Sequence, residues 1–129
     1  MEQSNYLIDT NIVIDFLGRK LSTNGMVFMN TIIDEIPNVS IITKIEVLGF
    51  NTTANQYRIL TDFMNDASVY ELTDEVANVC ITLRKKYKTK LPDAIIAATA
   101  LVSGFSLLTR NISDFKNIKD LKVVNPYSL

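Results

Sequence analysis

Four carboxylic acids lie near the ends of apolar segments in this sequence and could meet in the folded chain. They are Asp9, Glu46, Asp93 and Asp114. Two like charges about 4 Å apart repel by about 4 kcal/mol at an effective dielectric constant near 20. Because a folded domain is stable by only about 5 to 15 kcal/mol, a cluster of four ionised carboxylates needs a bound cation, unless some of them are protonated.

The available residue types restrict which cation could fill that role. The sequence contains no histidine and one cysteine, Cys80, which lies on the apolar face of a predicted helix. Oxygen ligands alone favour Mg²⁺ or Mn²⁺ over zinc or copper. Mg²⁺ keeps several waters and binds few carboxylates together with substrate phosphate oxygens, so these acids indicate phosphoester chemistry. Without a histidine as general base, metal-bound water is the natural nucleophile.

Short apolar segments alternate with helical patterns along the chain, and these elements must position the acids. Apolar β-type runs predict strands at residues 5–9, 39–43, 68–72, 105–109 and 122–124. Helical spacing, caps and breakers predict helices at residues 11–17, 26–36, 54–65 and 92–103, one that Thr73 or Asp74 caps, and one from about Lys44 that carries Glu46 on its first turn. Strands joined by helices imply right-handed crossovers, so the predicted fold is a three-layer α/β/α sandwich with a mostly parallel central sheet.

Sites in open parallel sheets form outside the carboxyl ends of the strands. Asp9 ends the first predicted strand, Glu46 follows the second by three residues, and Asp114 follows the segment 105–109 by five. Asp93 instead opens a helix, whose partial positive charge favours a carboxylate there. If that helix packs beside the same edge of the sheet, all four acids share one crevice.

Composition sets the remaining expectations. A chain of 129 residues with 47% hydrophobic residues is expected to form one domain, residues 1–129. The net charge of -1 gives no global basic footprint, so any nucleic acid must be bound locally. The start of the chain lacks signal-peptide features, so we expect a cytoplasmic protein. The most apolar stretch, residues 94–102, is about half the length that crosses a bilayer, so no membrane segment is expected.

The four acid-containing segments resemble the sequence blocks of PIN-domain ribonucleases. The segments are LIDTNIVIDFL, SIITKIEVLGF, KLPDAIIAATAL and LLTRNISDF. Their order and spacing, over essentially the whole chain, are most similar to those of VapC-type toxins from bacterial and archaeal toxin–antitoxin pairs. The resemblance implies a PIN-like fold and a Mg²⁺- or Mn²⁺-dependent endoribonuclease that cuts single-stranded or loop RNA, often tRNA. It also implies a homodimer that a small antitoxin protein silences.

The resemblance also implies roles for individual residues. The metal-binding and catalytic acids would be Asp9, Glu46, Asp93 and Asp114. Supporting polar positions of the family correspond to Thr10, Asn11, Thr109 and Asn111.

Each acid also has an ordinary structural interpretation. Asp9 could cap the following helix, and Asp93 could stabilise a helix dipole by about 0.3 to 1 kcal/mol. Glu46 could be a solvated helix residue, and Asp114 could belong to a capping turn. Asp15 is expected to be an exposed or supporting group and not a ligand. The presence of all four blocks favours the metal-site interpretation for the four acids.

The segment RKKYKTK, residues 84–90, carries five cations and no acid. These cations are Arg84, Lys85, Lys86, Lys88 and Lys90. Two interpretations explain this run equally well. It could be a solvated helix end, favoured by the helix dipole, or a patch that contacts RNA phosphates beside the site. An unchanged salt dependence of RNA binding in a Lys85→Glu, Lys86→Glu variant would remove the patch from the site.

Two other classes of function fit the size and the α/β alternation. Phosphoacceptor receiver-like signalling domains share an acidic pair after the first strand, but here Asp9 is followed by Thr10 and Asn11. Haloacid-dehalogenase-like phosphatases need an aspartate at the position of Asn11. A catalytically silent interaction module would keep the fold for protein contact alone, and failure to bind any divalent ion would favour it.

Overall fold

The computed structural model describes residues 3–128. Within this range the chain forms five parallel strands in the order β3-β2-β1-β4-β5. The strands are β1 (Gln3–Ile8), β2 (Ile36–Ser40), β3 (Ser68–Tyr70), β4 (Ser106–Leu108) and β5 (Val123–Val124). The helices are α1 (Thr10–Leu17), α2 (Thr23–Ile33), α3 (Ile41–Leu48), α4 (Ala54–Asp66), α5 (Asp74–Lys86), α6 (Leu91–Ser103) and α7 (Ile112–Phe115), and a 3-10 turn follows at Pro126–Ser128.

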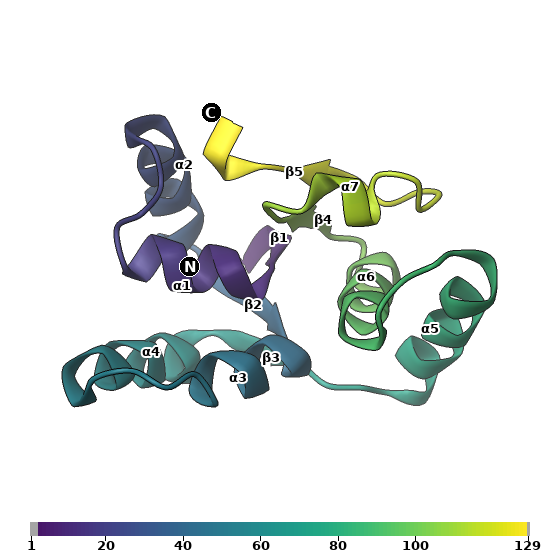
Figure 1. The fold of residues 1–129 in the computed structure, drawn as a ribbon, viewed down its shortest axis with the longest axis horizontal. Coiled ribbons are helices and arrows are strands. Elements are labelled where there is room, and N and C mark those ends of the chain that lie inside the picture. Colours follow the sequence, from purple (N-terminus) through teal and green to yellow (C-terminus); the bar gives the residue numbers. More distant parts are fainter. Residues whose placement is uncertain (1–2, 129) are drawn as a thin grey trace.

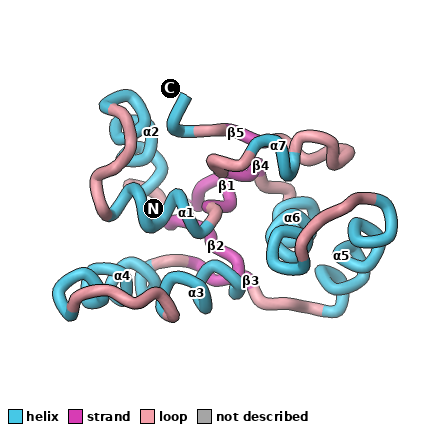
Figure 2. Tube along the Cα trace, in the orientation of Figure 1, coloured by secondary structure: helices cyan, strands magenta, loops and turns pink. Residues whose placement is uncertain are grey.

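The helices cover both faces of the sheet, as the alternating pattern predicts. In Figure 1, α5 and α6 lie on one side of the strands, and α1, α2 and α4 lie on the other. Figure 2 shows the same layers, with the strands in the middle and helices around them. The predicted three-layer α/β/α sandwich with a parallel sheet is therefore confirmed.

Successive side chains of a strand point to opposite faces, and this alternation divides the core into two halves. Leu7 and Leu107 pack with α5, α6 and Phe115 on one face. Ile8 and Leu108 pack with α1, α2 and α4 on the other. Both faces are apolar because each is covered by helices, which is typical of parallel sheets. No helix among the described residues is both long and apolar enough to pass through a bilayer.

The structure corrects the predicted elements around residues 26–48. The predicted helix 26–36 lies at Thr23–Ile33, and Pro37, expected to end it, lies inside β2. The pairing of β2 with β1 is irregular there, so the missing N–H of proline is tolerated. The predicted strand 39–43 overlaps β2 only at residues 39 and 40, because the chain turns into α3 after Ser40, whose Oγ accepts the Ile42 N–H at 3.1 Å.

Other boundaries agree more closely with the predictions. α6 contains Pro92 in its first turn and ends at Gly104, which has a φ of 74°. Thr73 caps α5, and its Oγ1 accepts the Val76 N–H at 3.2 Å. The strands β3, β4 and β5 are shorter than predicted, and the short helix α7 was not predicted.

Candidate active site

Asp9 lies at the carboxyl end of the central strand, directly before α1. Its side chain is 5% exposed and accepts two hydrogen bonds. Oδ1 accepts the Thr10 N–H at 2.8 Å, so Asp9 also caps α1, and Oδ2 accepts the Thr109 hydroxyl at 2.7 Å. The capping interpretation and a ligand role are therefore compatible, because each oxygen retains acceptor capacity.

Thr109 reaches Asp9 because of the strand register. β1 and β4 are adjacent and parallel, with Ile8 opposite Leu108, so the next residues of both strands meet at the same edge. Thr109 is fully buried, and its Oγ1 accepts the N–H of Asn111 at 3.0 Å while it donates to Asp9. The sheet thus fixes the orientation of the Asp9 carboxylate.

A second set of hydroxyl groups holds Glu46. Thr10 Oγ1 lies 2.7 Å from Glu46 Oε1 and 3.1 Å from Thr43 Oγ1. Since a hydroxyl has one proton, Thr10 donates to the carboxylate and accepts from Thr43. Glu46 itself is exposed and lies on the second turn of α3, not on the first turn as predicted, because α3 begins at Ile41 and not at about Lys44.

Electrostatics connect Asp9 with its neighbours. Burial raises the pKa of the Asp9 carboxyl, and the Glu46 carboxylate raises it further. The hydrogen bonds from Thr109 and from the Thr10 N–H act in the opposite direction, as does the charge of Arg110. Asp9 is therefore a buried acid that gains from any additional positive charge.

Asp93 lies in the first turn of α6 and is partly buried. Burial raises the pKa of its carboxyl, and the Asp9, Asp114 and Glu46 carboxylates raise it further. Lys90, directly before α6, lowers this pKa. Each of the other three acids therefore acts electrostatically on Asp93 at the start of α6.

The four acids do not form a closed ligand cage. Among residues 3–128, no three acidic, cysteine or histidine side chains lie close enough together to hold one metal ion. Asp114 is exposed on the short helix α7. An open arrangement suits Mg²⁺, which takes one or two carboxylates and retains waters. The donor set is also all oxygen, and a cation would offset both the burial that chiefly raises the pKa of Asp9 and Asp93 and the repulsion from neighbouring carboxylates.

The other two predicted supporting residues lie beside these acids in the chain. Asn11 is partly buried in the first turn of α1. Asn111 is the N-cap residue of α7, and its backbone N–H donates to Thr109 Oγ1.

The cations of the basic run 84–90 have different surroundings. Arg84 Nη1 donates to the Thr89 carbonyl at 2.7 Å, and Lys86 Nζ lies 5.6 Å from the ring centre of Tyr87. Lys90 is the cation of this run whose charge acts on Asp93. Lys85 and Lys88 are exposed. Contact between this run and RNA stays a prediction.

Two neighbours of the acids were not singled out by the sequence. Thr43 is fully buried and contacts Thr10; its position three residues before Glu46, on the same helix face, is a signal that could have revealed it. Arg110 lies between two supporting residues, Thr109 and Asn111, and its charge reaches Asp9.

Comparison with known proteins places this geometry in a family. The family model for the PIN domain matches residues 6–121. Ribonuclease VapC1 of Rickettsia felis is 28% identical over 135 residues, which cover 92% of this chain and 93% of that protein. A toxin–antitoxin complex from Klebsiella pneumoniae contains a chain with 32% identity and a TM-score of 0.78, covering 95% of this chain and 98% of its own. DNA-bound VapBC from Salmonella typhimurium has 18% identity, a TM-score of 0.80 and coverage of 98% and 99%, and shows the shared fold. The chain described here belongs to the PIN-domain family.

Proposed function

We propose that this protein is a divalent-metal-dependent endoribonuclease that acts as the toxin of a type II toxin–antitoxin pair. The observation that carries the proposal is the partly buried Asp93, whose pKa is raised by burial and further by the Asp9, Asp114 and Glu46 carboxylates, together with the hydroxyl groups that hold Asp9 and Glu46. The similarity to a VapC1 ribonuclease and to a chain of a toxin–antitoxin complex supports the same conclusion.

Asp9 and Asp93 are the proposed main ligands of Mg²⁺ or Mn²⁺, with Glu46 and Asp114 beside them. When bound, the ion would act as a Lewis acid on the phosphodiester and lower the pKa of an attacking water. The chain supplies orientation, because Thr109 and the Thr10 N–H fix both oxygens of Asp9. The Thr10 hydroxyl holds one oxygen of Glu46 at the same edge.

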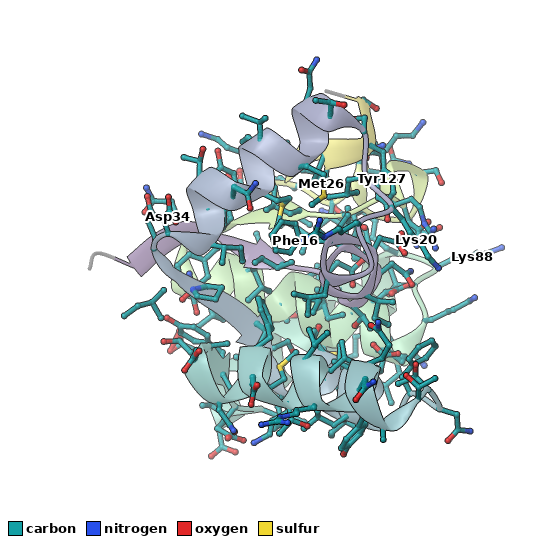
Figure 3. All side chains as sticks on the ribbon, turned by 90° about the vertical axis from the view of Figure 1, so that its left-hand side faces the viewer. Phe16, Lys20, Met26, Asp34, Lys88 and Tyr127 are labelled. Atoms are coloured by element: carbon teal, nitrogen blue, oxygen red, sulfur yellow. The ribbon has the colours of Figure 1, made fainter. Side chains whose placement is uncertain are left out.

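A small antitoxin and a second copy of this chain are the proposed protein partners. Several large apolar side chains are exposed on the described part of the chain; they are Val27, Ile45, Phe50, Tyr57, Ile59, Leu72, Ile81 and Leu91. A cavity of about 470 Å³ also opens beside α1, α2 and α4, lined by Phe16, Leu17, Met26 and Ile59 among others. Phe16 and Met26 can be followed in Figure 3. Such surfaces suit the apolar face of a partner helix.

The test is cleavage of a total RNA pool, with the fragment ends mapped. We expect cleavage with Mg²⁺ or Mn²⁺ and none with a chelator. Asp93→Asn should abolish cleavage while circular dichroism and thermal unfolding show an intact fold. Asp62→Asn, the same change at an exposed position on α4, is the matched control and should cleave normally.

Four results would contradict this proposal. Cleavage without any divalent ion, or by the Asp93→Asn variant at the normal rate, would exclude the metal-site chemistry. Stable labelling by a phosphodonor would instead favour a receiver-like domain. Failure to bind any divalent ion would favour a silent interaction module.

A further inference from the structure

Arg110 occupies an unusual position between the acids and a separate cluster of side chains. It lies in the turn between β4 and α7, directly after Thr109. Arg110 Nη1 is 3.5 Å from Asp15 Oδ2, and its Cζ is 5.8 Å from the ring centre of Tyr127. The Tyr127 hydroxyl donates to the same Asp15 oxygen. Three distant segments of the chain therefore meet at this one guanidinium group.

The Asp15–Tyr127 side of this cluster is firmly held. The Asp15 side chain is only 15% exposed and lies on α1. Tyr127 belongs to the turn Pro126–Ser128, which packs closely on α2: a Cβ added to Gly25 would lie 2.6 Å from the Pro126 carbonyl oxygen. Figure 3 shows Tyr127 beside Met26 of α2. Asp15 and Tyr127 thus form a fixed support for the exposed arginine.

Arg110 itself contributes little to the stability of the fold. Its side chain is 49% exposed, and an exposed ion pair at 3.5 Å adds little to stability. The guanidinium has five N–H donors in a planar fork, and the Asp15 contact involves one nitrogen. Since about half of the side chain is exposed, solvent or a ligand can reach the guanidinium. Arg110 also directly follows Thr109, whose hydroxyl donates to Asp9 at 2.7 Å, so the backbone that carries this guanidinium adjoins the acids.

A positively charged group beside the acids would help RNA to bind. A cluster of acids repels the phosphates of an incoming RNA strand, and the net charge of -1 gives no global attraction to offset this. A guanidinium suits this role because it pairs with a phosphate through two parallel hydrogen bonds.

We propose that Arg110 binds a phosphate of the RNA strand beside the bond that is cut, and that Asp15 and Tyr127 are its positioning residues. The inference rests on the proposed ribonuclease function and adds a substrate-binding residue to it. It also separates the substrate-binding role of Arg110 from the basic run 84–90, in which Arg84 is occupied by the Thr89 carbonyl.

The first experiment measures KM and kcat for a labelled single-stranded RNA at several salt concentrations. Charge-assisted hydrogen bonds of this kind change affinity by about 10- to 100-fold, so Arg110→Gln should raise KM by about tenfold or more with a smaller change in kcat. The slope of log(1/KM) against log[salt] should become shallower by about 0.7, the value for one phosphate contact on a single strand. Arg110→Lys should restore the slope but only part of the KM. Arg58→Gln, at an exposed arginine on α4, should change neither.

The second experiment tests the positioning residues. Tyr127→Phe keeps the ring beside Arg110 but removes the hydroxyl that donates to Asp15. We expect a raised KM in the otherwise natural protein and no further rise in the Arg110→Gln background, which shows that Tyr127 acts through Arg110. A purely structural role would lower the unfolding temperature and leave KM unchanged.

The failures of the two proposals are distinguishable. If the natural protein cleaves RNA and Arg110→Gln has a normal KM and salt slope, the inference about Arg110 is wrong and the ribonuclease proposal stands. If the natural protein does not cleave RNA with Mg²⁺ or Mn²⁺, both proposals fail together.

Discussion

The hydrogen bond from Thr109 to Asp9 can be tested directly by the substitution Thr109→Val. Valine has nearly the shape of threonine and favours the same extended backbone, so the change removes a hydroxyl without opening a cavity. That hydroxyl donates to Asp9 Oδ2 at 2.7 Å and accepts the Asn111 N–H at 3.0 Å. Both contacts are lost together.

The expected cost follows from the burial of these groups. A hydrogen bond to a charged partner contributes about 1.5–3 kcal/mol, and a neutral one contributes about 0.5–1.5 kcal/mol. Because Thr109 is fully buried and Asp9 is 5% exposed, water cannot easily replace either bond. We expect Thr109→Val to lower the free energy of unfolding by about 2–4 kcal/mol. For a chain of this length, that corresponds to a fall in Tm of about 8–16 °C.

The cost should also depend on pH. The Thr109 hydrogen bond lowers the pKa of Asp9, so it stabilises the ionised carboxylate. In the valine variant the folded-state pKa of Asp9 is higher, and the carboxyl takes up a proton earlier as the pH falls. Part of the penalty then disappears, so the difference between the two proteins should be larger at about pH 8 than at about pH 4.5.

The assay is urea unfolding of metal-free protein at both pH values, with Thr99→Val as the matched control. Thr99 is also buried, at 1% exposure, but its hydroxyl donates to the Ile95 carbonyl of its own helix at 2.7 Å. Its loss should cost about 1 kcal/mol or less and should not depend on pH. The reasoning is refuted if Thr109→Val has the same small, pH-independent effect as Thr99→Val.

Three further predictions concern the metal site and the packing of the C-terminal turn. Mg²⁺ or Mn²⁺ at about 100 times its Kd should stabilise the natural protein by about 2.7 kcal/mol, and calorimetry should show this gain strongly reduced in Asp9→Asn. Because the pKa of Asp93 is raised, protonation of its carboxyl stabilises the metal-free fold fully below the unfolded value of 3.8, and this contribution is lost as the pH rises through the folded-state pKa. Asp93→Asn should therefore stabilise metal-free protein at neutral pH and flatten its curve of Tm against pH. An unchanged curve would contradict the shared acidic environment. Gly25→Ala should cost about 1–3 kcal/mol in unfolding experiments, because the new Cβ would lie 2.6 Å from the Pro126 carbonyl oxygen, whereas a neutral effect would mean that the turn moves away freely.

The layered fold could be predicted from sequence because its elements carry strong local signals. Pro92 and Gly104 bracket α6, and Thr73 marks the start of α5. The error at residues 39–43 had a physical cause: the β-branched residues there favour strands, but the hydroxyl of Ser40 caps a helix that begins at Ile41. As a local signal Pro37 predicts the end of a helix, whereas tertiary pairing accommodates it in β2.

The candidate site was predictable only in part. The position of Asp9 follows from the strand end, since parallel strands direct such residues to one edge. The contact of Thr109 with Asp9 depends on the pairing of β1 with β4, which no local pattern reveals. The cluster of Arg110, Asp15 and Tyr127 joins residues 95 and 112 positions apart, so neither spacing nor helical periodicity indicates it.

The pairing of β1 with β4 also determines when the acids can be assembled during synthesis. Asp9 is made early, but the threonine that orients it comes 100 residues later, on a strand that pairs with β1. A nascent chain that ends before β4 leaves one edge of the central strand unpaired and one oxygen of Asp9 without its hydroxyl donor. A ribosome must therefore translate the chain through Thr109 before this carboxylate can take its final orientation, and fragments that end earlier lack that arrangement.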